Sequence, residues 1–278
     1  MQRPRLSFKD QTVLITGASS GIGREAALAF AGAGANVVLV ARRAAALAKV
    51  AVETRKLGAA TLSVPTDVTK PEAVAICFRK ATKRFGSIDI VVNNAGIMIP
   101  ARVVDIRGAD LQQMLDVNLF GALHVMQQAV QLMREQGHGH IVNVASLAGR
   151  RGVSPLGAYC ATKFALVGLT EALRMELVGE GIHISLVMPG VVDTPLATAA
   201  QQDASLGANW PEKLNMPPSW VVGCIFLAIR FKLTEIAVPP GAALLEKLAA
   251  LTPGTTDSVL RWASDAMRRV SGRRKTPR

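Results

Sequence analysis

The stretch Thr12–Gly23, TVLITGASSGIG, decides the fold of this chain. Its first five residues, Thr12–Thr16, are apolar or β-branched and predict a buried strand. Glycines follow at 17, 21 and 23, where they allow a sharp turn, a close backbone approach to a pyrophosphate and tight packing of a helix on the strand. The N-terminus of that helix presents unpaired N–H groups and a positive dipole end to phosphate. A glycine triplet in this position predicts a dinucleotide-binding turn within a βαβ unit.

Short β-like runs alternate with helical stretches outward from this turn, as far as Gly190. Such alternation implies βαβ units and a parallel sheet covered by helices on both faces. Right-handed crossovers then predict a single Rossmann-type, doubly wound α/β domain. The expected strands are Thr12–Thr16, Val37–Val40, Thr61–Val64, Ile88–Val92, His140–Val144 and His183–Val187.

The chain changes character after Pro189-Gly190. Residues 191–218 contain four prolines and an isolated Trp210, which predicts a mobile insertion, or lid, near the strand ends. We expect a buried helix at Trp220–Phe231, a last strand at Thr234–Val238 and a short helix at Ala242–Leu251. The predicted organisation is one domain over residues 1–251, with the lid at about 191–218, and a basic helix or tail over residues 252–278.

Composition favours a buried α/β core over several other classes of protein. Half of the 278 residues are hydrophobic and only 4% are aromatic, which suits parallel strands and not a single-stranded nucleic-acid binder. The longest apolar run, Trp220–Ile229, is about half of what a membrane-spanning helix needs. No apolar stretch precedes Asp10, so we expect no secretory signal.

Three scattered cysteines, Cys77, Cys160 and Cys224, predict reduced core thiols, neither a disulfide framework nor a metal site. The four histidines have no ligand spacing, so we expect them to be structural or exposed and expect no bound metal. Together with the lack of a secretory signal, these features favour a cytoplasmic protein.

The formal net charge of +12 raises the question of an anionic partner. Much of the excess lies at the termini, with seven basic residues against two acidic ones from Thr252 onward. One interpretation is a solvated tail. The other is weak attraction of the tail to an anionic membrane surface, because Val259, Leu260, Trp262 and Met267 are interspersed with its arginines. We expect no nucleic-acid partner.

The end of the second expected strand reads Ala41-Arg42-Arg43. An NAD-binding chain of this architecture typically has an acid here, which accepts hydrogen bonds from the adenosine ribose. An arginine can instead form paired hydrogen bonds with a 2′-phosphate, so the sequence favours NADP(H) over NAD(H). The alternative is that both arginines simply begin a surface helix.

Two further segments follow strand ends on the expected cofactor side. Asp67 could accept a hydrogen bond from the adenine amino group, although it could equally be a helix N-cap ahead of Pro71. The small residues of Asn93-Asn94-Ala95-Gly96 would let a cofactor pass close to the backbone, although this segment also has ordinary turn chemistry.

Tyr159 and Lys163 are four residues apart, so they share one face of a helix. An ammonium group beside a phenol favours the phenolate and lowers the phenol pKa, which would allow proton exchange near neutral pH. Ser146 supplies a hydroxyl that could hold a carbonyl or alcohol oxygen beside the phenol. These three residues predict proton transfer to or from a substrate oxygen.

Together these motifs resemble the classical short-chain dehydrogenase/reductase family over residues 10–195. The matching residues are Thr16-Gly17-x-x-x-Gly21-Ile22-Gly23, Asn93-Asn94-Ala95-Gly96, Asn118, Ser146, Tyr159-x-x-x-Lys163 and Pro189-Gly190. The resemblance implies a sheet of about seven strands, a homodimer or homotetramer, and nicotinamide-dependent interconversion of a carbonyl and an alcohol in a small molecule.

The resemblance also implies a role for each matching residue. Tyr159 would be the general acid for reduction and the base for oxidation, and Lys163 would hold the nicotinamide ribose and lower the tyrosine pKa. Ser146 would orient the substrate oxygen, and Asn118 would hold a water linking Lys163 to solvent. Thr194 would bind the carboxamide. The complete cofactor set is Gly17, Ser19, Ser20, Gly21, Ile22, Arg42, Arg43, Asp67, Val68, Asn94, Ala95, Gly96, Tyr159, Lys163, Pro189, Gly190, Val192 and Thr194.

The substrate is expected to be apolar, with Leu147, Val153, Leu156 and Met188 as candidate pocket walls or plain core residues. The segment Ile236–Gly241 differs from the Val-Asp-Gly-Gly turn of many acyl-carrier-protein reductases, which counts against that activity. It also leaves a dimer through the helices carrying Asn118 and Tyr159 more plausible than the C-terminal tetramer contact. The alternatives are a non-catalytic dinucleotide sensor, a membrane-surface protein acting through its tail, and a sugar-nucleotide epimerase.

Overall fold

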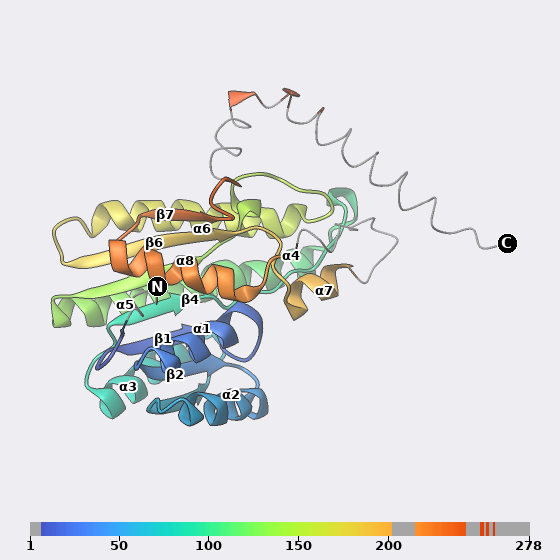
Figure 1. Ribbon diagram of the computed structural model, residues 1–278. Coiled ribbons are helices and arrows are strands. Elements are labelled where there is room, and N and C mark those ends of the chain that lie inside the picture. Colours follow the sequence, from blue (N-terminus) through green and yellow to red (C-terminus); the bar gives the residue numbers. More distant parts are fainter. Residues whose placement is uncertain (1–6, 202–214, 243–250, 253, 256–257, 259–278) are drawn as a thin grey trace, which may run out of the picture. The chain divides into compact units, whose positions relative to one another are not determined.

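A computed structural model describes residues 7–201, 215–242, 251–252, 254–255 and 258 (Figure 1). The chain divides into two compact units, Met1–Pro239 and Pro240–Arg278. All of the strands and helices discussed below belong to the first unit. Most of the helix expected at Ala242–Leu251, and nearly all of the basic tail, lie outside the described residues, so the domain boundary expected at 251/252 stays a prediction.

Seven parallel strands form one sheet in the order β3-β2-β1-β4-β5-β6-β7. This confirms the expected Rossmann-like sheet. The strands are β1 Thr12–Thr16, β2 Asn36–Ala41, β3 Thr61–Pro65, β4 Ile90–Asn93, β5 Gly139–Val144, β6 Ile182–Pro189 and β7 Glu235–Val238.

Most strand boundaries lie within one residue of the expectation, and two differ from it by two residues, both at sites of long-range contact. The fourth strand begins at Ile90 and not at Ile88, because the Gln136 side chain takes both backbone groups of Ile88, at 3.1 Å each. The sixth strand continues to Pro189, because Met188 and Pro189 pair with β7.

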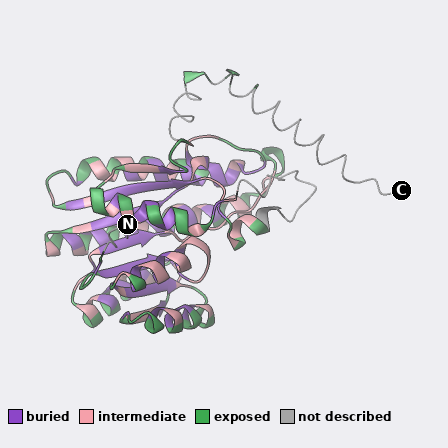
Figure 2. Cartoon of the chain, in the orientation of Figure 1, coloured by how far each residue is buried: buried purple, intermediate pink, exposed green. Residues whose placement is uncertain are grey.

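The central strand β1 is buried on both faces. Val13 and Ile15 point into the core beneath α1 (Gly21–Gly32), and Leu14 between them points to the other face. All five residues of β1 are buried. Figure 2 shows the buried residues concentrated in the strands of the sheet. A strand covered on both sides needs an unbroken apolar run, which is what TVLIT supplies.

Helices cover both faces of the sheet (Figure 1). On one face α1 packs between α2 (Ala44–Lys56) and α8 (Pro218–Phe231). The other face carries α3 (Pro71–Phe85), α5 (Gly121–Gln136) and α6 (Gly157–Glu176). The expected helix at Trp220–Phe231 is thus present as α8 and begins two residues earlier.

The crossover from β6 to β7 departs from the expected right-handed pattern. The sheet grows in one direction from β4 through β7, and α5 and α6 cross on the same face. Helix α8 crosses on the opposite face, against α1, so its hand is opposite to that of the preceding crossovers.

The expected lid is described only in part. Its first residues form α7 (Pro195–Gln201), and an isolated bridge joins Val192 to Met216, while residues 202–214 lie outside the description. Within the described residues, no helix combines the length and apolar character needed to cross a membrane.

Candidate active site

The glycine turn between β1 and α1 is closed by contacts that leave no room for side chains. Gly17 has a φ of +67°, and a Cβ there would lie 2.8 Å from Asn94 Nδ2. A Cβ on Gly23 would overlap the carbonyl oxygen of Gly17. The turn therefore brings the first turn of α1 against the backbone that precedes it, as the glycine spacing predicts.

Thr16 fixes this turn to the loop that follows β4. Its Oγ1 accepts hydrogen bonds from the backbone N–H groups of Asn94, at 2.9 Å, and Ala95, at 3.0 Å. The Asn94 side chain donates back to the Thr16 carbonyl at 3.0 Å. The two loops meet where the strand order reverses between β1 and β4, which is the usual ligand site of a doubly wound sheet.

A cavity of about 320 Å³ lies along this edge. The expected cofactor residues that line it are Gly17, Ser19, Ser20, Gly21, Ile22, Arg42, Arg43, Asp67, Val68, Asn94, Ala95, Gly96 and Thr194. Residues that the sequence reasoning missed are Ala41, Thr66, Ile97, Val117, Pro195 and Leu196. Ala41 and Thr66 directly precede residues that were expected, so their place at the strand ends could have revealed them.

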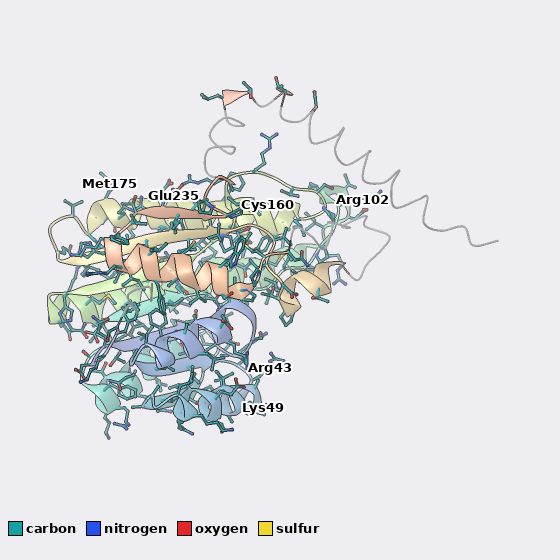
Figure 3. The ribbon with its side chains drawn as sticks, viewed as in Figure 1. Arg43, Lys49, Arg102, Cys160, Met175 and Glu235 are labelled. Atoms are coloured by element: carbon teal, nitrogen blue, oxygen red, sulfur yellow. The ribbon has the colours of Figure 1, made fainter. Side chains whose placement is uncertain are left out.

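The end of the cavity beside β2 is basic. Arg42 and Arg43 follow β2, are exposed and have no ion-pair partner in the described part of the chain. Asp67 Oδ1 accepts hydrogen bonds from Thr69 N, at 3.0 Å, and Thr69 Oγ1, at 2.9 Å. Lys70 is the N-cap of α3, so the alternative interpretation of Asp67 as that cap is wrong. Figure 3 labels Arg43 near the start of α2 and Lys49 further along the same helix.

Ser146 lies directly after β5 and caps a short 3₁₀ turn, η3 (Leu147–Gly149). Its Oγ accepts a hydrogen bond from Ala148 N at 3.1 Å and donates one to the Pro189 carbonyl at 3.2 Å. These contacts hold the hydroxyl at the carboxyl edge of the sheet. Ser146 also lies near enough to Tyr159 to lower the pKa of the phenol by side-chain hydrogen bonding, so the structure brings the two predicted residues together.

Tyr159 and Lys163 are both buried on α6, and burial moves their pKa values in opposite directions. Loss of water raises the pKa of Tyr159 to about 12, against the opposing effect of the Ser146 hydrogen bond. The same desolvation lowers the pKa of Lys163 to about 8. The expected lowering of the tyrosine pKa by the lysine is not seen. Lys163 Nζ donates to the Val144 carbonyl at 3.1 Å and lies 5.7 Å from the phenol ring centre.

Asn118 lies in a π-helical turn, η2 (Asp116–Phe120), a distortion that is frequent at functional sites. Its side chain accepts from Ile97 N at 2.8 Å and donates to Ile97 O at 2.9 Å and Thr162 Oγ1 at 3.0 Å. Asn118 thus ties the loop after β4, through Ile97, to Thr162 on α6. A Cβ on Gly96 would lie 3.3 Å from Asn118 Oδ1 and 3.7 Å from Lys163 Nζ, so these groups meet at one point.

The segment after β6 backs the cavity from the other side. Thr194 lies against α1, since a Cβ on Gly21 would be 3.0 Å from its methyl carbon. Pro189 and Gly190 are held by the edge strand, with Gly190 N donating to Val238 O at 2.8 Å, and Val192 is buried. Five of the expected cofactor residues do not line the cavity, namely Tyr159, Lys163, Pro189, Gly190 and Val192.

An apolar cluster surrounds the ring of Tyr159. Its buried members are Met114, Ala148, Leu156, Ala158, Tyr159 and Cys160, with Ile97, Met98, Ile99, Ile106 and Leu111 packed against them. Of the candidate pocket walls, Leu156 belongs to this cluster and Val153 is exposed. Leu147 contacts the Gly190 position, whereas Met188 is fully buried in β6 and is a core residue.

The fold and site define a Rossmann-like protein whose glycine turn and serine–tyrosine–lysine group share one edge of the sheet. Comparison with known proteins agrees. The model of the short chain dehydrogenase family matches residues 11–205. The chain belongs to the short-chain dehydrogenase/reductase family and is an oxidoreductase.

Individual relatives extend over most of the chain. Ketoacyl reductase HetN of Nostoc sp. is 34% identical over 258 residues, covering 91% of this chain and 88% of the relative. A short chain dehydrogenase/reductase from Burkholderia phymatum, solved with NAD, has a TM-score of 0.80 at 28% identity, covering 90% of this chain and 96% of the other. A variant of actinorhodin polyketide ketoreductase, solved with NADPH, has a TM-score of 0.77 at 29% identity, covering 86% and 98%.

Proposed function

We propose that this protein is an NADP(H)-dependent oxidoreductase that interconverts a carbonyl and an alcohol, with Tyr159 as the general acid or base. The observation that carries the proposal is the meeting of Ser146, Tyr159 and Lys163 at the edge that also holds the glycine-lined cavity. Each residue alone has ordinary structural explanations. Their convergence beside a phosphate-binding turn supports hydride chemistry coupled to proton transfer.

The cavity residues fit a dinucleotide. Its pyrophosphate would lie at Gly17–Ile22 against the N-terminus of α1, where Ser20 makes no side-chain capping bond and the first N–H groups remain available. Asp67 would accept from the adenine amino group, Lys163 would hold the nicotinamide ribose, and Thr194 would bind the carboxamide. Bound NADP(H) supplies or accepts a hydride.

The preference for NADP(H) rests on the cations at the adenosine end. Arg42 and Arg43 line the cavity where an NAD site typically has an acid, and Ala41 leaves that place without a carboxylate. Among the structural neighbours one was solved with NAD and another with NADPH, so family membership alone does not decide between the two. The arginines favour the 2′-phosphate.

Each of the proposed catalytic side chains would have a separate role in proton transfer. In reduction, Ser146 would hold the substrate oxygen while the Tyr159 hydroxyl gives it a proton, since a pKa of about 12 keeps the phenol protonated at neutral pH. Lys163, with a pKa near 8, can exchange a proton in the neutral range. Asn118 uses both of its side-chain N–H groups for Ile97 and Thr162. A water that links Lys163 to solvent would therefore have to donate a hydrogen bond to an oxygen of Asn118.

The apolar cluster around Tyr159 supports an apolar substrate. We further propose a homodimer or homotetramer assembled through the helices near Asn118 and Tyr159. Phe120 in η2 and Phe164 in α6, each 44% exposed, support that contact.

A screen of NADPH oxidation across aldehydes, ketones, quinones and steroids tests the function, with Tyr159→Phe as the decisive variant. The variant keeps the ring in its apolar cluster but cannot give a proton. We expect NADPH binding to be retained and turnover to fall by about 10²–10⁴-fold. Cys160→Ala is the matched control, because that neighbouring thiol is buried and its raised pKa makes it a poor nucleophile. Turnover in Tyr159→Phe close to that of Cys160→Ala would refute the assignment.

A further inference from the structure

Arg150 joins three separate segments of the chain through one guanidinium group. It follows η3 directly, and its Nη2 lies 2.6 Å from Glu171 Oε1 and 2.6 Å from Glu235 Oε2. Glu171 is on α6 and Glu235 is the first residue of the edge strand β7. The Arg150 side chain is only 25% exposed, so water screens these ion pairs less than it screens a pair on the open surface.

The short segment that begins at Ser146 is held at both of its ends. Ser146 is the N-cap of η3 and is fixed by Ala148 and Pro189, while Arg150 is the C-cap and is fixed by the two glutamates. Between them, a Cβ on Gly149 would lie 2.9 Å from the Lys163 carbonyl. This close packing means that a shift of η3 would move it relative to α6.

Glu171 lies on α6, the helix that also carries the predicted proton-transfer residues. It is three turns beyond Tyr159 and two beyond Lys163, at the more exposed end of a row with a spacing of four residues. Arg150 therefore ties the Ser146 segment to the helix that carries Tyr159 and Lys163. Its second ion pair, to Glu235, ties the same segment to the sheet.

We propose that Arg150 is a positioning residue for this site: its two ion pairs hold η3 against α6 and so set the place of the Ser146 hydroxyl relative to Tyr159. This role rests on the proposed carbonyl–alcohol chemistry for its effect on turnover. Its effect on the Ser146–Tyr159 hydrogen bond is independent of that chemistry. The two can therefore be measured separately.

The first measurement needs neither cofactor nor substrate. Tyr159 is the only tyrosine of the chain, so labelling the ring carbon that bears the hydroxyl gives a single NMR resonance sensitive to its hydrogen bond. We expect this resonance at neutral pH to shift in Arg150→Met in the same direction as in Ser146→Ala. Arg134→Met is the matched control, because Arg134 makes a comparable ion pair with Glu180, at 2.6 and 2.8 Å, on the exposed surface. A parent-like resonance in Arg150→Met would overturn the proposal.

The second measurement is the turnover of the same variants. We expect kcat of Arg150→Met to fall about 10- to 100-fold with little change in NADPH affinity, because a displacement near 1 Å costs on that order. Arg134→Met should leave kcat unchanged. A lower kcat with an unmoved resonance would assign Arg150 a merely structural role.

Arg150→Lys provides a folded alternative if the methionine variant is unstable. An ammonium group retains the charge but not the planar fork, so we expect a smaller shift of the resonance and partial recovery of kcat. The parent protein could fail to oxidise NADPH with every carbonyl compound tested while the resonance still shifts in Arg150→Met. In that case the proposed function fails and the positioning role stands. If the parent is active and no Arg150 variant moves the resonance, the positioning role fails alone.

Discussion

At the scale of single residues, burial is the main influence on the pKa values of Tyr159 and Lys163, the residues proposed to transfer the proton. It raises the Tyr159 pKa to about 12 and lowers the Lys163 pKa to about 8, so the tyrosine is the weaker acid of the two. The sequence predicts the proximity of the two side chains from their spacing. It does not predict the order of their pKa values, because desolvation depends on the surrounding apolar cluster.

Arg42 is the residue on which the choice of dinucleotide should depend. We expect Arg42→Ala to weaken NADPH binding about tenfold or more, since a hydrogen bond to a charged group contributes roughly 1.5–3 kcal/mol. NADH affinity should be unchanged, because NADH has no 2′-phosphate. Titration of both dinucleotides measures this, with Lys49→Ala as control: Lys49 is an exposed cation on α2, the helix that follows Arg42 and Arg43, and it does not line the cavity. Equal affinities of the parent for NADPH and NADH would contradict the assignment.

At the scale of elements, the glycines of α1 are not equivalent. A Cβ at Gly23 would overlap the Gly17 carbonyl, whereas a Cβ at Gly32, at the end of the same helix, would meet no atom within 4 Å. We expect Gly23→Ala to lower the free energy of unfolding and to abolish dinucleotide binding. Gly32→Ala should be neutral or stabilise by up to about 1 kcal/mol.

Urea unfolding and NADPH titration of the two glycine variants test this contrast. The substitution is chemically the same in both, so helix propensity alone would change the free energy of unfolding in the same direction in both variants. Full NADPH affinity in a folded Gly23→Ala variant would show that the close packing of α1 on the turn is not required.

Whether a segment forms a strand or a helix follows from its local sequence in this chain. Where that element begins and what it packs against do not. The TVLIT run and the glycines after it specify a strand and a turn within twelve residues, which is why the cofactor edge could be predicted. The start of β4 depends on Gln136, 48 residues away from Ile88, and the Arg150 ion pair depends on Glu235, 85 residues away. Contacts at such separations leave no periodic pattern in the chain.

The opposite hand of the β6–α8–β7 crossover has the same explanation. Helix α8 is apolar enough to pack on either face, and the local pattern of Pro218–Phe231 contains nothing that selects one. Its place against α1 is settled by a three-ring contact of Phe226 with Phe30 and Phe8, at centroid distances of 4.6 and 4.8 Å.

At the scale of the whole molecule, the buried histidine at the amino edge of the sheet should govern acid stability. His140 Nε2 bonds Ser185 Oγ at 2.8 Å, and burial lowers its pKa from 6.5 to about 4, with His183 and Lys232 adding to the effect. The unfolded chain binds a proton at the ordinary pKa, so stability falls as pH decreases from about 6.5 towards 4. We expect a slope of up to about 1.4 kcal/mol per pH unit from this group.

Urea unfolding at several pH values measures this dependence, and His140→Gln should flatten it. His138 is the matched control because its pKa is raised, chiefly by its hydrogen bond to Asp89. Its contribution is fully present below its ordinary pKa of 6.5 and lost as pH rises through the raised value, so His138→Gln should lower stability by a constant amount in the acid range and leave the acid slope unchanged. An unchanged acid slope in His140→Gln would contradict the assignment.

The basic charge of the molecule is distributed more widely than the sequence analysis predicts. Besides the termini, the last turns of α2 and α3 carry Arg55, Lys56, Lys83 and Arg84, all exposed. Cations at these positions face the negative ends of the helix dipoles and stabilise them. Part of the net charge of +12 therefore has a structural explanation within the sheet domain.

The reversal of strand order between β1 and β4 separates two proposed properties of the molecule, the choice of dinucleotide and the transfer of the proton. The residues proposed to choose the dinucleotide follow β2 and β3, while those proposed to move the proton lie beyond β5 and on α6. Substitutions on opposite sides of the reversal share no partner, so their free-energy effects should add. Evolution or protein engineering could therefore exchange NADP(H) for NAD(H) at one side of the reversal without changing the pKa of Tyr159 at the other.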